Sequence, residues 1–200
     1  AVDLENDIAV LQYTGGTTGV PKGAMLTHAS ISMNVEQLTL WTSPSLREGT
    51  ETIICVLPLF HVFAMTAVMH CAVKRAMTIV LHPKFDVNDV LKSIEKHRPT
   101  VLHGVPAIFN ALATHARVRD YDFSSLRFCI TGGAPMPQDV HRLFEDKTGC
   151  GALREGYGLT ETSPGVTFNP AVGDVKPGSV GLPVPGTIVD IVCPETGNML

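Results

Sequence analysis

The sequence has few charged residues and no strong excess of either sign. Only 17% of its 200 residues are Asp, Glu, Lys or Arg, and the formal net charge is -4. The basic side chains are scattered along the chain and form no stripe that could follow a nucleic-acid backbone. These features argue against a nucleic-acid-binding protein, and any handling of phosphate must be local.

Cysteine is also sparse, and its spacing is not that of a metal site. The number of cysteines is odd and no Cys-x-x-Cys pair occurs; the five are Cys55, Cys71, Cys129, Cys150 and Cys193. This usage argues against a disulfide framework and a zinc site, and it favours a reducing compartment. The first residues are acidic, which is the wrong charge for a signal peptide. The predicted location is cytoplasmic.

Residues 52–73 carry no formal charge, which at this length raises the question of a membrane span. Pro58 interrupts the run, and His61 and His70 would be costly in lipid. The first half is rich in β-branched residues and the second half is not. The run therefore predicts a buried strand followed by a buried helix that ends at Lys74 and Arg75.

The rest of the chain alternates between strand and helix patterns. Strands are expected over residues 8–11, 52–56, 77–81, 100–102, 126–130 and 188–192. Helices are expected over 29–41, from the cap Asp86 to just before Pro99, over 106–115 and over 137–147. Thr27 and Asp86 are candidate helix caps. From residue 155 onward we expect mostly loops and little helix. The alternation predicts an α/β fold, a mainly parallel sheet flanked by helices on both faces, with ligands outside the carboxyl ends of its strands.

A glycine-rich loop follows the first predicted strand, and that strand is expected to be buried. The loop reads Tyr13-Thr14-Gly15-Gly16-Thr17-Thr18-Gly19-Val20-Pro21-Lys22-Gly23. Glycines allow backbone N–H groups to approach an anion, while the threonines and Lys22 add donors and a positive charge. The spacing differs from the Walker A loop, because Pro21-Lys22-Gly23 stands where Gly-Lys-Ser/Thr would be required. The pattern predicts a cradle for polyphosphate, with an ordinary Gly/Thr turn as the alternative.

This loop resembles the phosphate-loop signature of the adenylate-forming enzymes, which include acyl-CoA synthetases, luciferases and peptide-synthetase adenylation domains. Two further motifs match that family in the same order: Pro58-Leu59-Phe60-His61 and Tyr157-Gly158-Leu159-Thr160-Glu161-Thr162. The nearest subgroup is the bacterial long-chain fatty acyl-CoA synthetases, and the resemblance covers practically the whole chain. The chain is thus expected to be a single fragment, residues 1–200, of the large N-terminal AMP-binding domain, without the C-terminal domain.

The resemblance implies roles for residues of each motif. Thr160, Glu161 and Lys22 are the expected catalytic residues, and Glu161 is also the expected Mg²⁺ ligand. The expected nucleotide-binding residues are Thr14, Gly15, Gly16, Thr17, Thr18, Gly19, Lys22, Gly133, Ala134, Pro135, Gly156, Tyr157, Gly158 and Thr160. The expected substrate-binding residues are His61, Phe63, Val105 and Gly132. Met65 and Phe109 are further candidates for the acyl tunnel, and a plain core role explains each of them equally well.

The resemblance also implies the reaction and its components: a fatty acid, ATP with Mg²⁺, and coenzyme A as the second substrate. The ribose-binding aspartate and the lysine that promotes adenylation would lie beyond Leu200 in this family, so the isolated chain is expected to be inactive. Gly15 departs from the commoner Ser/Thr, which removes one hydroxyl donor. An enzyme that adenylates an aryl or amino acid and a non-catalytic nucleotide-binding module remain the alternatives. Truncation is expected to favour self-association, and peripheral membrane contact stays open.

Overall fold

The centre of the molecule is a seven-stranded mixed sheet, and the computed structural model describes residues 1–14 and 21–200 of the chain. In spatial order its strands are β4 (Thr78–Leu81), β3 (Thr52–Cys55), β5 (Val101–Gly104), β6 (Phe128–Thr131), β7 (Leu153–Gly158), β8 (Gly165–Phe168) and β9 (Leu182–Pro183). The first five strands are parallel, and β8 and β9 add antiparallel pairs at one edge. The predicted mainly parallel sheet is confirmed.

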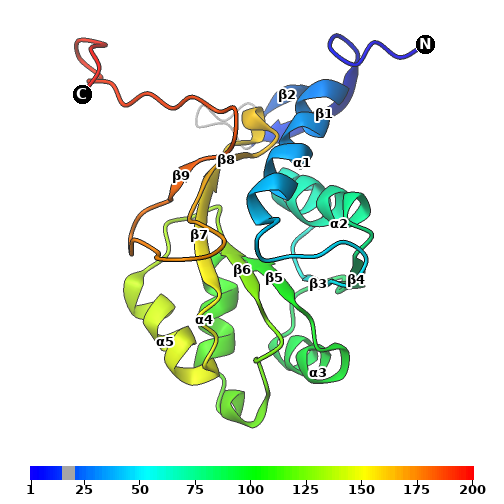
Figure 1. Cartoon of the computed structure of the whole chain (residues 1–200), viewed down its shortest axis with the longest axis vertical. Helices are drawn as coiled ribbons and strands as arrows, with labels where there is room; N and C mark the ends of the chain where they lie inside the picture. Colours follow the sequence, from blue (N-terminus) through cyan, green and yellow to red (C-terminus); the bar gives the residue numbers. More distant parts are fainter. Residues whose placement is uncertain (15–20) are drawn as a thin grey trace.

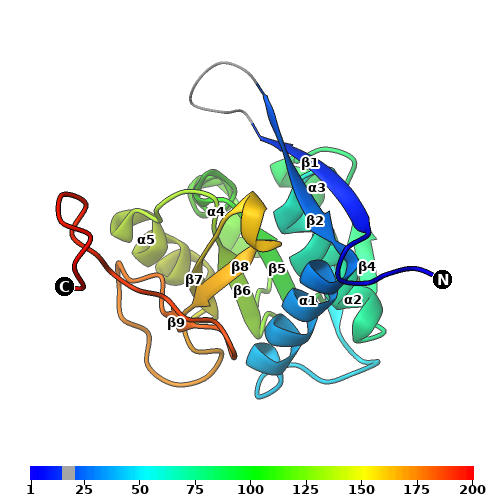
Figure 2. The ribbon, with the colours of Figure 1, turned by 90° about the horizontal axis from the view of Figure 1, so that it is seen from above.

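Helices form two groups, which cover opposite faces of this sheet. One group is α1 (His28–Thr42), the π-helix η1 (Phe63–His70) and α2 (Cys71–Lys74); the other is α3 (Val87–His97), α4 (Pro106–Thr114) and α5 (Gln138–Thr148). Figure 1 and Figure 2 show the strands between the two groups. From β3 the chain moves to the edge strand β4, and it then returns past β3 to form β5, β6 and β7 in order. Because crossovers between parallel strands are right-handed, the helices that connect strands in one direction lie on one face and those that connect them in the other direction lie on the opposite face. The reversal creates a switch point between β3 and β5, where ligands of such sheets bind.

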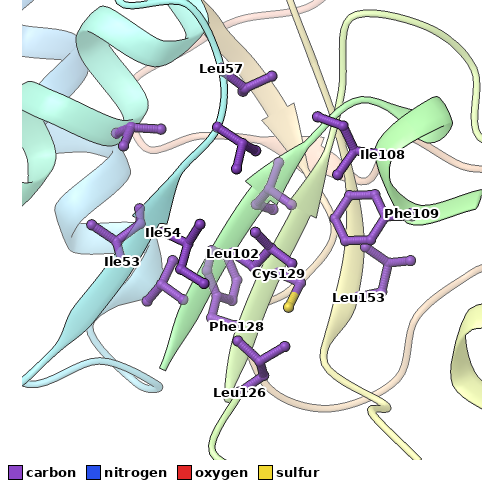
Figure 3. Close-up of a cluster of buried hydrophobic side chains, with 14 of the residues drawn as sticks. Ile53, Ile54, Leu57, Leu102, Ile108, Phe109, Leu126, Phe128, Cys129 and Leu153 are labelled. Carbon is purple, nitrogen blue, oxygen red and sulfur yellow. The ribbon is translucent and has the colours of Figure 1, made fainter. Parts of the chain in front are cut away.

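The core is built by strands that are buried on both faces. Ile54 and Leu102 are fully buried on β3 and β5, and Phe128 is almost fully buried on β6. Figure 3 shows Ile54 and Leu102 near Cys129, and Phe109 of α4 beside Leu153, whereas Phe128, one residue before Cys129 on β6, points to the opposite face of the sheet. Continuous apolar strands are typical of parallel sheets whose two faces are covered by helices. This packing holds the strand ends in register.

Local signals at the helix ends behave as the sequence predicts. The Thr27 hydroxyl accepts from the Ser30 backbone N–H at 3.1 Å, and Asp86 accepts from two backbone N–H groups at the start of α3. Each side chain satisfies donors that the helix leaves unpaired. The uncharged run 52–73 forms a buried strand and a buried helix, as expected, although most of that helix has π geometry. In the part of the chain that the structure describes, no helix is long and apolar enough to cross a membrane.

The prediction of a buried first strand is wrong. Among residues 1–14 and 21–200, β1 (Ile8–Thr14) pairs only with β2 (Lys22–Thr27), in an antiparallel hairpin separate from the large sheet, and Ile8, Leu11 and Tyr13 are exposed. Figure 2 shows the hairpin standing apart from the large sheet. A short β-branched run favours a strand but does not specify which neighbour covers it, because burial depends on tertiary contacts.

The carboxyl-terminal third also differs from expectation. The expected strand over residues 188–192 is absent from the described chain, and only an isolated bridge joins Val192 to Met199. Ile188 is 87% exposed, so its β-branched side chain has no sheet to join. Conversely, residues 155–168 contain most of β7 and all of β8 where loops were expected. The expectation of little helix is confirmed, since this region has only the 3-10 turn η3 (Thr160–Thr162).

Candidate active site

A cleft of about 290 Å³ opens at the carboxyl ends of β6 and β7. It is bounded by Thr14 of the hairpin, by the start of η1, by the glycines that follow β6, and by residues 156–165. These segments are far apart in the sequence, yet the parallel sheet brings their ends to one edge. The cleft lies where a doubly wound sheet collects its ligands.

The hairpin forms one wall of the cleft. Thr14 ends β1 and lies opposite Lys22, the first residue of β2, and the Thr14 hydroxyl donates to the Lys22 carbonyl at 3.4 Å. Lys22 is exposed, and β2 lies in contact with η3. The candidate phosphate-binding residues Gly15, Gly16, Thr17, Thr18 and Gly19 lie outside the described residues.

The turn after β6 forms a second wall. Gly132 and Gly133 line the cleft, whereas Ala134 and Pro135 follow them on the exposed surface. Gly133 has a φ of +78°, a conformation that favours glycine. Val105 does not line the cleft; its Cγ1 would lie 3.6 Å from a Cβ on Gly133, so it packs behind this turn. The bare backbone here offers a flat surface for a planar ligand.

The end of β7 forms the third wall and carries Tyr157, which is 45% exposed and lines the cleft between Gly156 and Gly158. Both glycines are required by close approaches. A Cβ on Gly156 would lie 2.4 Å from the Phe168 ring, and one on Gly158 would lie 2.1 Å from the Pro164 carbonyl oxygen. The β7–β8 pairing therefore sets the position of Tyr157, whose aromatic ring is available to stack on a ligand.

Thr160 and Glu161 line the cleft from the short turn η3. The turn is closed by hydrogen bonds from the Thr162 N–H to the Leu159 carbonyl at 3.2 Å and from the Leu159 N–H to the Thr162 hydroxyl at 3.0 Å. Within the described residues, no group of three or more His, Cys, Asp or Glu side chains could hold a metal ion. A single carboxylate can contribute to a Mg²⁺ site, because Mg²⁺ is usually held by one or two carboxylates together with water and phosphate oxygens.

The start of η1 provides the remaining wall. His61 and Phe63 line the cleft, and the His61 Nδ1 accepts from the Phe63 backbone N–H at 3.2 Å. Met65 instead packs in a small separate core against Leu26 and Ile31. Phe109 is fully buried against Phe144, with ring centroids 5.2 Å apart. The structure therefore assigns Met65 and Phe109 to the core and not to the cleft, because their helices turn these positions inward.

A smaller inner cavity of about 40 Å³ lies beneath the cleft, and Phe63 and Phe168 contribute to the lining of both. His103 of β5 also lines the inner cavity, stacked on Phe63 at 6.1 Å between ring centroids. Its Nδ1 is buried without a hydrogen-bond partner among the described residues. Burial lowers the pKa of the His103 imidazole to about 4, so this residue is neutral at pH 7.

The buried His103 predicts a specific loss of stability in acid. Its folded-state pKa of about 4 is depressed, so between roughly pH 6.5 and 4 the unfolded chain binds a proton that the folded chain does not. The stability contribution is complete above pH 6.5 and falls as the pH drops. Between pH 7 and pH 5 we expect the wild type to lose about 2 kcal/mol more than a His103→Leu variant.

Urea unfolding of the 200-residue chain at the two pH values measures this difference. Carboxylates titrate equally in wild type and variant, so their contributions cancel in the comparison. Parallel pH dependences for the two proteins would contradict the prediction.

Glu155 is a site residue that the sequence reasoning missed. Its carboxylate is 9% exposed and accepts from the Met136 backbone N–H at 3.1 Å, which ties the turn after β6 to β7. Its backbone carbonyl also accepts from the Asn169 N–H. The sequence does place an acidic residue immediately before the glycines of β7. Because a buried carboxylate needs hydrogen-bond partners, this position could have indicated a structural contact. Glu155 therefore holds two walls of the cleft together.

Comparison with known proteins gives one family for the whole chain. The family described as AMP-binding enzyme matches residues 2–200. A long-chain-fatty-acid–CoA ligase of Bacillus subtilis is 46% identical over 198 residues, which cover 99% of this chain and 35% of that protein. The chain therefore spans about a third of the length of such relatives.

Solved structures agree with this similarity. The structure of ATP-bound MatB from Rhodopseudomonas palustris matches with a TM-score of 0.88 and 35% identity, covering 98% of this chain and 37% of that one. A long-chain-fatty-acid-CoA ligase from Archaeoglobus fulgidus matches with a TM-score of 0.85 and 30% identity, covering 100% of this chain and 41% of that one. The similarity in fold therefore extends over nearly the whole chain.

Proposed function

Since the chain belongs to the AMP-binding enzyme family, we propose that it is part of an ATP-dependent ligase that joins a long-chain fatty acid to coenzyme A. We further propose that residues 1–200 form one piece of the nucleotide-binding domain. The homology to acid–thiol ligases supports the reaction class. The fatty acid is the finer part of the proposal, and it rests on the apolar side of the cleft.

One observation carries the proposal: three separated motifs meet around a single cleft. Thr14 comes from the hairpin, His61 from the start of η1, and Tyr157 to Glu161 from the turn after β7. A structural role for each motif alone would not require them to converge. Convergence of hydroxyl, aromatic and carboxylate groups at the carboxyl ends of β6 and β7 supports a binding site for a nucleotide and a second substrate.

The chemistry of this reaction suits a site without a protein nucleophile. A carboxylate oxygen attacks the α-phosphorus of ATP, the bond to the bridging oxygen breaks, and pyrophosphate leaves with both bonding electrons. The thiolate of coenzyme A then attacks the acyl carbonyl and displaces AMP. Attack of one anion on another depends on positioning and charge neutralisation, and the residues around the cleft are of that kind.

Each wall of the cleft has a proposed role. Thr14 and Lys22, with the loop between them, bind the pyrophosphate part of ATP. Tyr157 stacks on one face of adenine, and the Gly133 backbone contacts the other face. Thr160 donates to the α-phosphate, where charge develops during transfer.

Glu161 is the proposed protein ligand of Mg²⁺. The ion would supply charge neutralisation between the attacking carboxylate and the polyphosphate. Glu161 would hold the ion at the α-phosphate end of the cleft, beside Thr160. This assignment places two of the three proposed catalytic side chains, Thr160 and Glu161, on the same turn.

The acyl group is proposed to lie against His61, Phe63 and Gly132. Phe63 lines both the cleft and the inner cavity, and we propose that its ring limits how far an acyl chain can enter. Replacing Phe63 with Ala joins the two spaces. We expect the kcat/KM for longer acids, relative to that for shorter ones, to rise several-fold in a full-length protein that contains this chain.

Assays against saturated acids of increasing length measure this ratio. Phe85→Ala serves as a control, because Phe85 packs against the core away from both cavities. An unchanged ratio in Phe63→Ala would exclude Phe63 from the acyl site.

Several functional parts are proposed to lie outside these 200 residues, including the ribose-binding aspartate and the adenylation lysine. The isolated chain is then an inactive nucleotide-binding unit. Cytoplasmic location is part of the proposal, and the free thiols at all five cysteines are consistent with it.

Two measurements test the proposed function at different levels. Calorimetry of the 200-residue chain with ATP and Mg²⁺ tests nucleotide binding directly. Pyrophosphate release by the full-length protein, measured with a panel of fatty, aryl and amino acids, tests the reaction and the substrate. Fatty-acid-dependent release supports the proposal, and release that depends only on an aryl or amino acid would replace it with that alternative.

A further inference from the structure

The turn that carries Thr160 and Glu161 is attached to α1 by a buried side chain. Asn34 of α1 is 3% exposed, and its Oδ1 accepts from the Gly165 N–H at 3.0 Å. Its Nδ2 donates to the carbonyl of the same Gly165 at 2.8 Å. The two residues are 131 positions apart, so this is a tertiary contact that joins α1 to the first residue of β8.

We propose that Asn34 is a positioning residue that holds the Thr160–Glu161 turn in place at the cleft; the proposal rests on the proposed function. A primary amide can pair with both backbone groups of one residue, which fixes the position and the orientation of that peptide. Gly165 itself lines the cleft. A displaced Gly165 would therefore move the turn that precedes it.

The same turn has a second, weaker attachment to α1. The Ser163 hydroxyl donates to the Ser30 hydroxyl at 3.1 Å, and Ser163 is 1% exposed with a φ of +74°. Between these attachments, the Pro164 carbonyl accepts from the Leu159 N–H at 3.1 Å and closes the loop. The loop from Leu159 to Gly165 is therefore held against α1 as one unit.

Close packing leaves little room for the loop to shift while Asn34 is present. A Cβ on Gly165 would lie 2.8 Å from Leu38 Cδ2 on α1 and 2.9 Å from the Phe168 ring. α1 also follows directly after β2, the strand that begins with Lys22. Asn34 therefore couples the wall that carries Glu161 to the helix that continues from the hairpin wall.

The test compares Asn34→Ala with Val90→Ala, which removes volume from a fully buried site on α3. Both substitutions destabilise the fold, but only the first releases the turn. In the 200-residue chain, we expect the hydrogen-bonded amides of Leu159, Thr162, Ser163 and Gly165 to exchange with deuterium at least tenfold faster in Asn34→Ala than in wild type. Amides of β3 and β5 should exchange no faster in Asn34→Ala than in Val90→Ala.

In the full-length protein, we expect kcat for pyrophosphate release to fall about tenfold in Asn34→Ala, with the KM for the fatty acid within twofold of wild type. The KM is maintained because His61 and Phe63 belong to other elements. Both variants are compared below their melting temperatures at equal folded fractions, where Val90→Ala should keep the wild-type kcat.

If amide exchange in Asn34→Ala rises equally throughout the chain, or if Asn34→Ala and Val90→Ala have equal kcat, Asn34 does not position the turn. If Asn34→Ala does not fold, Asn34→Asp is measured in its place with the same criteria, because it keeps the acceptor for the Gly165 N–H and loses the donor to the Gly165 carbonyl. Absence of any adenylation by the wild type would refute the proposed function instead, and the exchange experiment would still decide whether Asn34 holds the turn.

Discussion

Replacing Glu161 with Gln is expected to lower pyrophosphate release by about a hundredfold, roughly 2.7 kcal/mol in the activation free energy. The substitution keeps the volume and the hydrogen-bonding oxygen but removes the charge that would hold Mg²⁺. The turn is closed by backbone groups and by Thr162, so the fold should not change. The measurement requires a full-length protein that contains this chain.

Glu95→Gln provides the matched control for this prediction. Glu95 is an exposed residue of α3, away from the cleft, and the chemical change is identical. The control should retain wild-type activity, and both variants should unfold at the wild-type temperature. Near wild-type release by Glu161→Gln at ordinary Mg²⁺ concentrations would refute the assignment of Glu161.

Replacing Gly181 with Ala is expected to destabilise the chain by several kcal/mol, on the scale of backbone strain combined with overpacking. Gly181 has a φ of +88°, and a Cβ there would lie 2.0 Å from the carbonyl carbon and oxygen of Phe168. These atoms are backbone and cannot rotate away. Relief requires that β9 separate from β8.

Gly173→Ala is an internal control with the same backbone conformation. Gly173 also has a φ of +88°, but nothing lies within 4 Å of the position of its Cβ. Gly173→Ala should therefore lower the free energy of unfolding only by the cost of placing an Ala in a left-handed conformation, about 1–2 kcal/mol. The difference between the two variants isolates the collision at Phe168.

Urea unfolding followed by circular dichroism and by tryptophan fluorescence measures both variants. Trp41 is the single tryptophan, and its Nε1 donates to the Asn169 carbonyl at 3.1 Å, beside the collision site. We expect Gly181→Ala to change the Trp41 signal before global unfolding. Equal stabilities of Gly181→Ala and Gly173→Ala would show that β9 accommodates the methyl group.

The helices and the parallel strands could be predicted from local patterns. Apolar spacing and the Asp86 cap place α3 correctly, because both act within a few residues of the chain. The alternation of strands and helices then implies a parallel sheet, since crossovers return each strand in the same direction. The ordered motifs also named most of the cleft-lining residues before any contact was known.

Burial of individual strands and the shape of the cleft depended instead on contacts between distant residues. β1 has the composition of a buried strand, but within the described part of the chain it pairs only with β2. The glycines of β7 resemble a loop, yet Phe168 packs where their side chains would be. Asn34 carried no local signal, because its partner Gly165 is 131 residues away. Local propensity acts over a few residues, whereas close packing and buried hydrogen bonds form only once the sheet has brought these segments together.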